Sequence, residues 1–405
     1  MVLSNAQLAW IDLTADDRAR VRRVLDLFNE QGTVDELGLG SLRDTLSNAL
    51  FPGTSVLLTR LRYFLFIPWL YKHLETTGAA GDVAAQARRM ELQLVKALSG
   101  SDDTSGIIGI HAGASLSRLA SSAYWASMVR WGLFLPGQSQ GWYHTHFESL
   151  ARRRNEVGRA DDPGVTWARE PTWHPRLPPA PDGFPGEASF RLTHDEADFL
   201  RGRIEERCAG TLLAWLAREG SRSMDGMFWE VPEVLQTEAA ILDKVELARR
   251  FSLHVEGAPL LYNLILAEKR HELQGNEKDA ALGADYRRDL TEWADREAGE
   301  AHFDPDSLWR LVASQGGVLK GPQQRFVESW AGRVREIGPH AVADDTFLRG
   351  LIANRERQLK GDHRARVVNQ GRLLDWRGRV GVGRMSFRWS QVRQLLIDLH
   401  QGLAG

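Results

Sequence analysis

Residues 33–75 read TVDELGLGSLRDTLSNALFPGTSVLLTRLRYFLFIPWLYKHLE. This segment holds a helix-starting pattern, a turn at Pro52 and Gly53, and then the most apolar run of the chain. Proline lacks an amide hydrogen and glycine readily adopts left-handed backbone, so this pair ends helices. The segment therefore predicts two helices, at about 35–51 and 54–76, and favours a mainly helical fold.

Four charged residues stand among these apolar side chains, namely Arg43, Asp44, Arg60 and Arg62. A charge that leaves water must find an ion-pair or hydrogen-bond partner, because an unpaired buried charge costs several kcal/mol. We expect a structural pair such as Asp44 with Arg60 or Arg62. An enzymatic site built on Asp44, Arg43 and Arg60 is an alternative.

The composition is that of an ordinary globular protein. The chain has 405 residues, of which 43% are hydrophobic and 26% charged, and its formal net charge is −2. A single cysteine, Cys208, excludes a disulfide framework and an all-cysteine metal site, which fits a reducing cytoplasm. The run Val56–Tyr71 is too short and too charged for a membrane span. We therefore expect a cytoplasmic protein that does not enter a membrane.

The remaining chain predicts further helices and few strands. Seven prolines between positions 163 and 185 indicate a linker or wrapped loop. This gives a helical N-terminal domain at 1–158, a Pro-rich linker at 159–190 and a helical C-terminal domain at 191–405. Short strands are expected at 189–192 and 379–387. Helices are expected near 14–29, 84–98, 193–207, 210–219, 236–253, 259–272, 283–298, 306–314, 322–336, 343–360 and 388–402.

The order of elements over 84–145 resembles a winged helix-turn-helix. A helix with Ser and Arg at its exposed start would be the recognition helix, followed by a Gly-rich wing at 136–141. Its nucleic-acid contacts would be Arg118, Ser121, Ser122 and Arg130. However, Tyr124, Trp125, Met128 and Trp131 recur at spacings typical of a buried face. A winged-helix shape that contacts only protein therefore stays open.

The segment 349–394 is strongly basic. It has eleven Arg and one Lys against three acidic residues, and Trp376, Phe387 and Trp389 are interleaved with them. Guanidinium groups bind phosphate in a bidentate manner and indole faces stack on bases, so the pattern indicates a nucleic-acid-binding surface. Its phosphate contacts would be Arg364, Arg366, Arg372 and Arg377. Alternatively, this segment docks on residues 191–348, which carry a net charge of −9.

One short cluster has metal-ligand chemistry. His144, His146 and Glu148 lie within five residues, and on a helix His144 and Glu148 would share a face. No second cluster supplies further ligands, and no nucleophile or phosphate-loop motif occurs. We expect no metal, no cofactor and no assigned catalytic residue.

Several strings are distinctive, including Trp10–Thr14, Gly32–Gly40 and Leu50–Trp69. Together with Trp173–Pro175 and Leu260–Leu266 they resemble an uncharacterised bacterial family, catalogued as a domain of unknown function, whose members are about as long as this chain. The resemblance implies no activity. It implies genes that lie near helicases, nucleases and methylases of phage-defence islands.

These observations predict a non-enzymatic component of an anti-phage or DNA-processing system that binds DNA and a protein partner. An assembly factor that binds only protein is the first alternative. An unfamiliar nuclease, built around His144, His146 and Glu148 or around Asp44, is the second.

Overall fold

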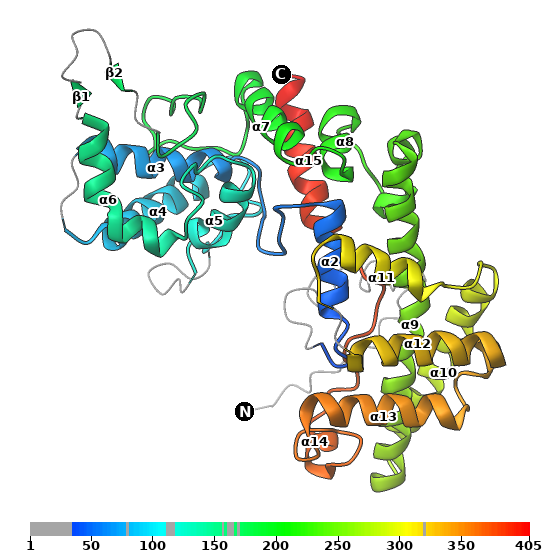
Figure 1. Ribbon diagram of the computed structural model, residues 1–405. Coiled ribbons are helices and arrows are strands. Elements are labelled where there is room, and N and C mark those ends of the chain that lie inside the picture. The colour runs from blue at the N-terminus through cyan, green and yellow to red at the C-terminus, as the bar shows by residue number, and fades with distance from the viewer. Residues whose placement is uncertain are drawn as a thin grey trace, which may run out of the picture. The chain divides into compact units, whose positions relative to one another are not determined.

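The computed structural model describes residues 35–77, 81–110, 118–155, 158–159, 166–167, 171–318 and 321–405 (Figure 1). Over these residues the chain is mainly helical, which confirms the predicted fold class. The described strands are β1 (Gly158–Arg159) and β2 (Thr166–Trp167), an antiparallel pair. The strands expected at 189–192 and 379–387 are irregular backbone instead. The helix expected at 14–29 lies outside the described residues.

No helix in the described part of the chain is both long and apolar enough to cross a membrane. The described residues form two compact units, and each is built from separate segments of the chain. Unit 1 contains residues 35–40, 252–305 and 321–385, whereas unit 2 contains the described residues of 41–251, 306–318 and 386–405. This division differs from the expected one, because the described residues of the Pro-rich stretch 159–190 belong to unit 2, and so does the C-terminal helix.

Unit 2 contains an aromatic core formed by its first helices. The helices of unit 2 as a whole are α2 (Gly40–Leu50), α3 (Tyr63–Thr77), α4 (Val83–Ser99), α5 (Ala120–Arg130), α6 (Gln140–Asn155), α7 (His194–Arg207), α8 (Leu212–Glu219), η2 (Phe228–Glu230), η3 (Pro232–Gln236), the first part of α9 (Ala239–Gln274), α11 (Pro305–Ser314) and α15 (Trp389–Leu403). Both α2 and α11 begin one residue before the boundary of the unit. Helix α3 packs on α4, α5 and α6. The ring of Phe64 stacks on that of Trp131 at 4.1 Å between centroids.

The helix expected from residue 54 begins at Tyr63, nine positions later. Side chains from distant parts of unit 2 accept hydrogen bonds from the backbone amides of residues 59–61, which would donate to carbonyls within a helix if the helix began at residue 54. The Tyr124 hydroxyl accepts from the amides of Thr59 and Arg60, and the Asp398 carboxylate accepts from the amide of Leu61 at 2.8 Å. Tertiary hydrogen bonds have thus overridden the local helix signal.

The wing expected after α5 is absent from the described residues. Residues 131–139 form turns with a single bridge from Phe134 to Trp173, and α6 then begins at Gln140. A winged helix needs a two-stranded hairpin at this place. The Gly-rich stretch instead leads directly into a helix.

The second half of unit 2 packs α15 against α7 and α8. Helix α7, expected at 193–207, starts with a capping box, in which Thr193 Oγ1 accepts from the amide of Glu196 and the Glu196 carboxylate accepts from the amide of Thr193. The approach of α15 is close, since a Cβ atom at Gly402 would lie 2.8 Å from the Cβ atoms of Ala197 and Leu192.

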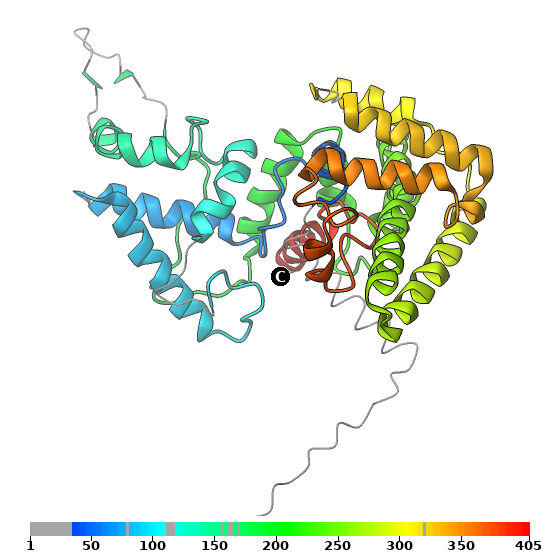
Figure 2. The ribbon, with the colours of Figure 1, turned by 90° about the horizontal axis from the view of Figure 1, so that it is seen from below.

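Unit 1 is a helical assembly built on the second part of α9. It contains α10 (Glu277–Ala298), α12 (Gly321–Ile337), η4 (Pro339–Ala341), α13 (Thr346–Lys360) and α14 (Gln370–Leu374). Two helices expected at 236–253 and 259–272 are the single helix α9, which continues through Pro259. Figure 2 shows α10 returning beside α9. Their contact is tight, because a Cβ atom at Gly257 would lie 2.6 Å from the Trp293 ring.

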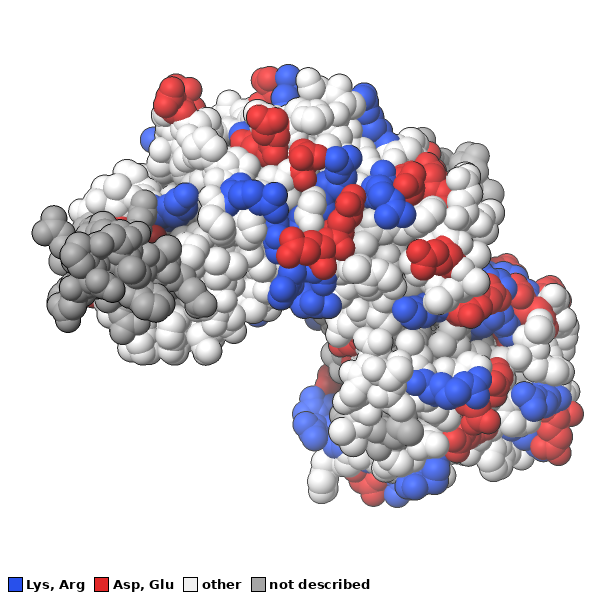
Figure 3. Space-filling model, turned by 45° about the horizontal axis from the view of Figure 1, so that its top comes forward, with Lys and Arg blue, Asp and Glu red and all other residues white. Residues whose placement is uncertain are grey.

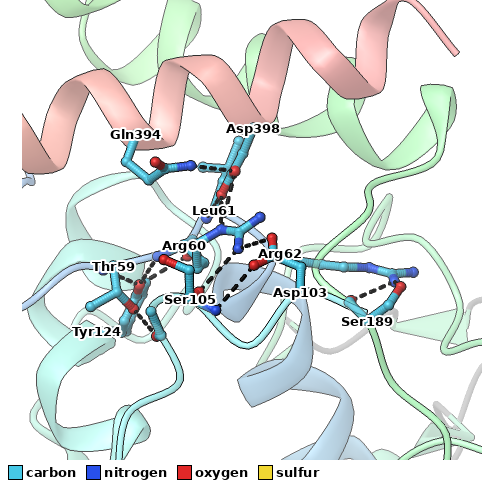
Figure 4. Close-up of polar contacts among 11 residues, drawn as sticks. Thr59, Arg60, Leu61, Arg62, Asp103, Ser105, Tyr124, Ser189, Gln394 and Asp398 are labelled. Carbon is cyan, nitrogen blue, oxygen red and sulfur yellow. Dashed lines mark hydrogen bonds and ion pairs between the residues drawn. The ribbon is translucent and has the colours of Figure 1, made fainter. Parts of the chain in front are cut away.

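The charges of the opening segment are paired, but with other partners than predicted. Arg60 lies between Asp398 and Asp103 (Figure 4). Arg62 binds Glu196 at 2.7 Å. Asp44 instead contacts Arg43 and Arg388. The predicted pairing of Asp44 with Arg60 or Arg62 is therefore wrong, because α15 and α7 of unit 2 bring the carboxylates that Arg60 and Arg62 need.

Candidate nucleic-acid interface

The first candidate surface is α5 of unit 2, where the structure places one predicted contact inside the protein. Ser121 is fully buried, and its hydroxyl donates to Oε1 of Glu91 at 2.5 Å. Its amide donates to Oε2 of the same carboxylate at 3.0 Å. Burial raises the pKa of Glu91, although the two bonds from Ser121 act in the opposite direction. Ser121 therefore joins α5 to α4 and offers no group to a ligand.

The bond between Ser121 and Glu91 belongs to a longer chain of hydrogen bonds. Gln140 Nε2 donates to the hydroxyls of Ser121 and Tyr71, at 2.8 and 2.9 Å. The Tyr71 hydroxyl lies 2.7 Å from Nε2 of His144. Burial lowers the pKa of His144, which favours the neutral ring. This chain links α3, α4, α5 and α6, so its first effect is to specify their packing.

The other predicted residues of this surface are exposed but separated. Ser122 donates to Oε1 of Gln140 at 3.1 Å. Arg118 precedes α5 and Arg130 is its last residue, so the two arginines stand at opposite ends of a helix about 16 Å long. The structure therefore does not bring Arg118, Ser122 and Arg130 together into one cluster.

The second candidate surface is the basic loop, residues 361–377 of unit 1. Gly361 follows α13 with a φ of 72°, a left-handed conformation that turns the chain out of the helix. The loop then forms successive turns and the five-residue helix α14. Asn369 fixes this shape, because its side chain donates to the carbonyl of His363 and accepts from the amide of Arg372, each at 3.0 Å.

A buried carboxylate holds the base of the loop. Glu356 is fully buried and accepts from the Tyr262 hydroxyl at 2.5 Å and from Lys360 Nζ at 2.9 Å. The backbone amides of Arg366 and Val367 donate to the same carboxylate at 2.9 and 3.0 Å. Desolvation and the bond to Glu356 raise the pKa of Tyr262 far above its usual range. Four donors on one carboxylate satisfy a buried charge that would otherwise be costly.

Arg366 belongs to this internal network rather than to the surface. Its guanidinium donates to Oε1 of Glu36 at 2.7 Å and to the Tyr262 hydroxyl at 3.3 Å. Lys360 contacts the other oxygen of Glu36, which is itself almost fully buried. The position of Arg366 therefore does not support its predicted role as a phosphate contact.

The other three predicted arginines of the loop, Arg364, Arg372 and Arg377, are exposed. Among the described residues, neither Arg364 nor Arg377 has a carboxylate partner, and Arg364 donates its Nε to the carbonyl of Lys360. Arg372 lies 3.5 Å from Asp375, and both side chains are more than half exposed. We call these three residues the exposed arginines.

The aromatic residues of the basic segment are not available for stacking. Trp376 is 3% exposed and Arg270 lies over its ring at 4.6 Å. Phe387 and Trp389 are buried in unit 2, where Trp389 Nε1 donates to the carbonyl of Gly226. The predicted interleaving of arginines and aromatic rings is therefore not a surface feature.

Other basic residues of the segment are bound to carboxylates or carbonyls within their own unit. Arg349 pairs with Glu268, Arg357 with Asp362, and Arg393 with Asp225. Arg355 donates to the carbonyl of Leu37 at 2.9 Å. Of these, Arg349 and Arg393 reach acidic residues of the stretch 191–348, as the docking alternative expected. Among the exposed arginines, Arg364 and Arg377 reach no carboxylate of the described residues, and Arg372 contacts the exposed Asp375. On the face drawn in Figure 3, basic and acidic side chains are interspersed.

The residues proposed for metal chemistry lie on α6. His146 stacks on Trp142 and its Nδ1 lies 2.8 Å from the Trp142 carbonyl, whereas His144 faces Tyr71. Over the described ranges, no group of three or more His, Cys, Asp or Glu side chains is arranged to hold a metal ion. Cys208 is buried, and burial raises its thiol pKa to about 11.

A family model described as a family of unknown function (DUF6361) matches residues 5–402, nearly the whole chain. The chain belongs to this family. The expected membership of an uncharacterised family is thereby confirmed. No curated protein and no solved structure matches this member of the family.

Sequence reasoning missed the residues that hold the basic loop in place. Glu36, Tyr262 and Glu356 come from three distant segments of this family member, and none stands in a recognisable motif. The one usable signal was Asn369, because Asn is a preferred helix N-cap and the residue precedes α14.

Proposed function

We propose that the protein is a non-enzymatic, cytoplasmic component of a bacterial anti-phage or DNA-processing system, and that it binds DNA through the exposed arginines of the basic loop. The observation that carries this proposal is the contrast within the segment 349–394. Arg349, Arg366 and Arg393 pair with carboxylates of their own unit. Arg364 and Arg377 reach no carboxylate among the described residues, and Arg372 contacts the exposed Asp375.

Cationic side chains that are exposed and not held in a buried ion pair are available to phosphate. A guanidinium group donates in a fork that fits two phosphate oxygens, and such charge-assisted bonds are among the stronger ones in proteins. The loop that carries the exposed arginines is braced by Asn369 and Glu356. Bracing reduces the entropy that would be lost when a ligand is bound.

The place of the protein in a defence system rests on what the resemblance to its family implies, namely genes that lie near helicases, nucleases and methylases of phage-defence islands. A component of this kind would bring DNA to an enzyme encoded nearby. The proposal therefore includes a protein partner, which would bind on another part of the chain.

Mobility shift of a short DNA duplex at low salt is the first test. The wild-type chain should bind at about 50 mM salt, where phosphate contacts are strong, and the variant R364A/R372A/R377A should lose most of this binding. A matched control is R201A/R218A/R288A, which removes the same charge from three arginines that are not buried and that pair with carboxylates of their own helices.

The control should bind as the wild type does. Equal loss in both triple variants would mean that binding depends on net charge alone, and absence of wild-type binding would contradict the proposal. Circular dichroism should show the same helix content for all three proteins, because none of the replaced side chains is buried.

A second candidate function, assembly with protein only, is favoured by one observation. Val368 and Leu374 are 49% and 47% exposed and lie on the same loop as the exposed arginines. Apolar side chains beside arginines are typical of protein interfaces. If V368S/L374S abolishes binding to a genetically neighbouring protein while DNA binding of the wild type is absent, this second function replaces the first.

A further inference from the structure

We infer that the basic loop recognises the sugar–phosphate backbone of double-stranded DNA, without base stacking and without readout of sequence. This inference rests on the proposed function and names the form of DNA that the loop would take. It follows from three features of the loop: its donors, its buried aromatic rings and the length of its helix.

The cationic donors on the loop are arginines, and His363 and Gln370 are exposed beside them. The exposed arginines are cations that suit phosphate oxygens, and Asn369, which could have read a base edge, already uses its side chain for His363 and Arg372. Contacts to phosphate set position and affinity but carry no sequence information. The available groups therefore favour the backbone.

Proteins that prefer single strands gain about 1–3 kcal/mol for each base that stacks on an aromatic ring. All three aromatic residues of the segment 349–394 are buried, with Phe387 at 0% and both Trp376 and Trp389 at 3% exposure. A single strand would lack a stacking surface on this loop. The stacking energy that would favour a single strand over a duplex is therefore not available on this loop.

Reading bases in the major groove needs a helix or ribbon that enters the groove. Helix α14 has five residues, which makes it about 8 Å long. Such a helix is too short to follow the groove as a recognition helix does. The duplex also carries the higher charge density, about one phosphate per 1.7 Å of axis, so three cations release more counterions from it.

The test uses the full chain and fluorescence anisotropy with three probes: a duplex of mixed sequence, a duplex of shuffled sequence and the single strand of the first. The two duplexes should bind equally, and the single strand several-fold more weakly. The affinity for duplex should fall about 40-fold between about 50 and 200 mM salt, as expected for three phosphate contacts.

The possible failures are distinguishable. If none of the probes binds, the proposed function is wrong and the inference falls with it. If DNA binds but the single strand binds as well as the duplex or better, or if the two duplexes differ several-fold, the proposed function stands and this inference is overturned. The loop variant R364A/R372A/R377A should bind all three probes weakly. An unchanged affinity of this variant for duplex would place the DNA site elsewhere and overturn the inference.

Discussion

The guanidinium of Arg60 donates its Nε to both carboxylate oxygens of Asp398, at 3.1 and 3.0 Å, although the two residues are 338 positions apart. Both side chains are almost fully buried in unit 2. The same carboxylate accepts from the amide of Leu61, so it joins α15 to the irregular segment before α3. This ion pair therefore connects two segments of unit 2 that lie near opposite ends of the sequence.

Removing one partner of this pair should be costly. Asp398→Ala leaves Arg60 buried with the half-exposed Asp103 as its one charged partner among the described residues, and we expect a loss of about 3 kcal/mol in the free energy of unfolding. Urea unfolding followed by circular dichroism measures it. A loss below about 0.5 kcal/mol, the range of ordinary surface substitutions, would contradict the proposed importance of the pair.

Gly257 should not tolerate alanine even though it lies inside a helix. The added methyl would meet the Trp293 ring at 2.6 Å, and overpacking of this kind costs about 1–3 kcal/mol. Gly350 in α13 is the matched control, because no atom lies within 4 Å of its added Cβ. Gly350→Ala should raise stability by up to about 1 kcal/mol. Equal effects of the two substitutions in thermal melts would refute the close helix contact.

Tyr262→Phe should weaken the support of the basic loop. The substitution removes the hydroxyl that donates to Glu356 at 2.5 Å and leaves ring packing in place. A buried hydrogen bond to a charged group contributes about 1.5–3 kcal/mol, and we expect a loss of stability in this range. DNA affinity should fall as well, because the backbone amides of residues 366 and 367 donate to the same Glu356 carboxylate. An unchanged melting temperature would show that the network does not hold the loop.

The stability of unit 2 should depend on pH below neutrality. Burial lowers the pKa of His144, His174 and His400 in the folded protein. The unfolded chain therefore binds protons more readily, so stability is complete above the unfolded pKa of about 6.5 and falls as pH decreases below it. Urea titrations at pH values on both sides of 6.5 measure this fall. His400→Gln should reduce the slope, and an identical slope would exclude His400 as a contributor.

The sequence predicted the helical class because helix periodicity and caps are local. The capping box of Thr193, at the start of the helix expected at 193–207, depends on neighbours within three residues. Where α3 starts could not be predicted. Its start depends on Tyr124 and Asp398, which contribute acceptors from elsewhere in the sequence.

In the candidate site, too, some features could be expected from the local sequence and others depend on distant residues. Arg364, Arg372 and Arg377 stand in a polar stretch without periodic apolar residues, so their exposure could be expected. Arg366 has the same surroundings in sequence but pairs with Glu36, which is 330 positions away. No local pattern distinguishes it from its neighbours. The burial of Trp376 likewise depends on Arg270 of α9.

We propose that three arginines of the basic loop contact DNA phosphates. The most direct test is the slope of log affinity against log salt concentration for a duplex, measured with the wild-type chain and with R364A/R372A/R377A. Each phosphate contact contributes about 0.9 to the slope, so the variant should have a slope shallower by about 2.7. Equal slopes in the two proteins would contradict the account.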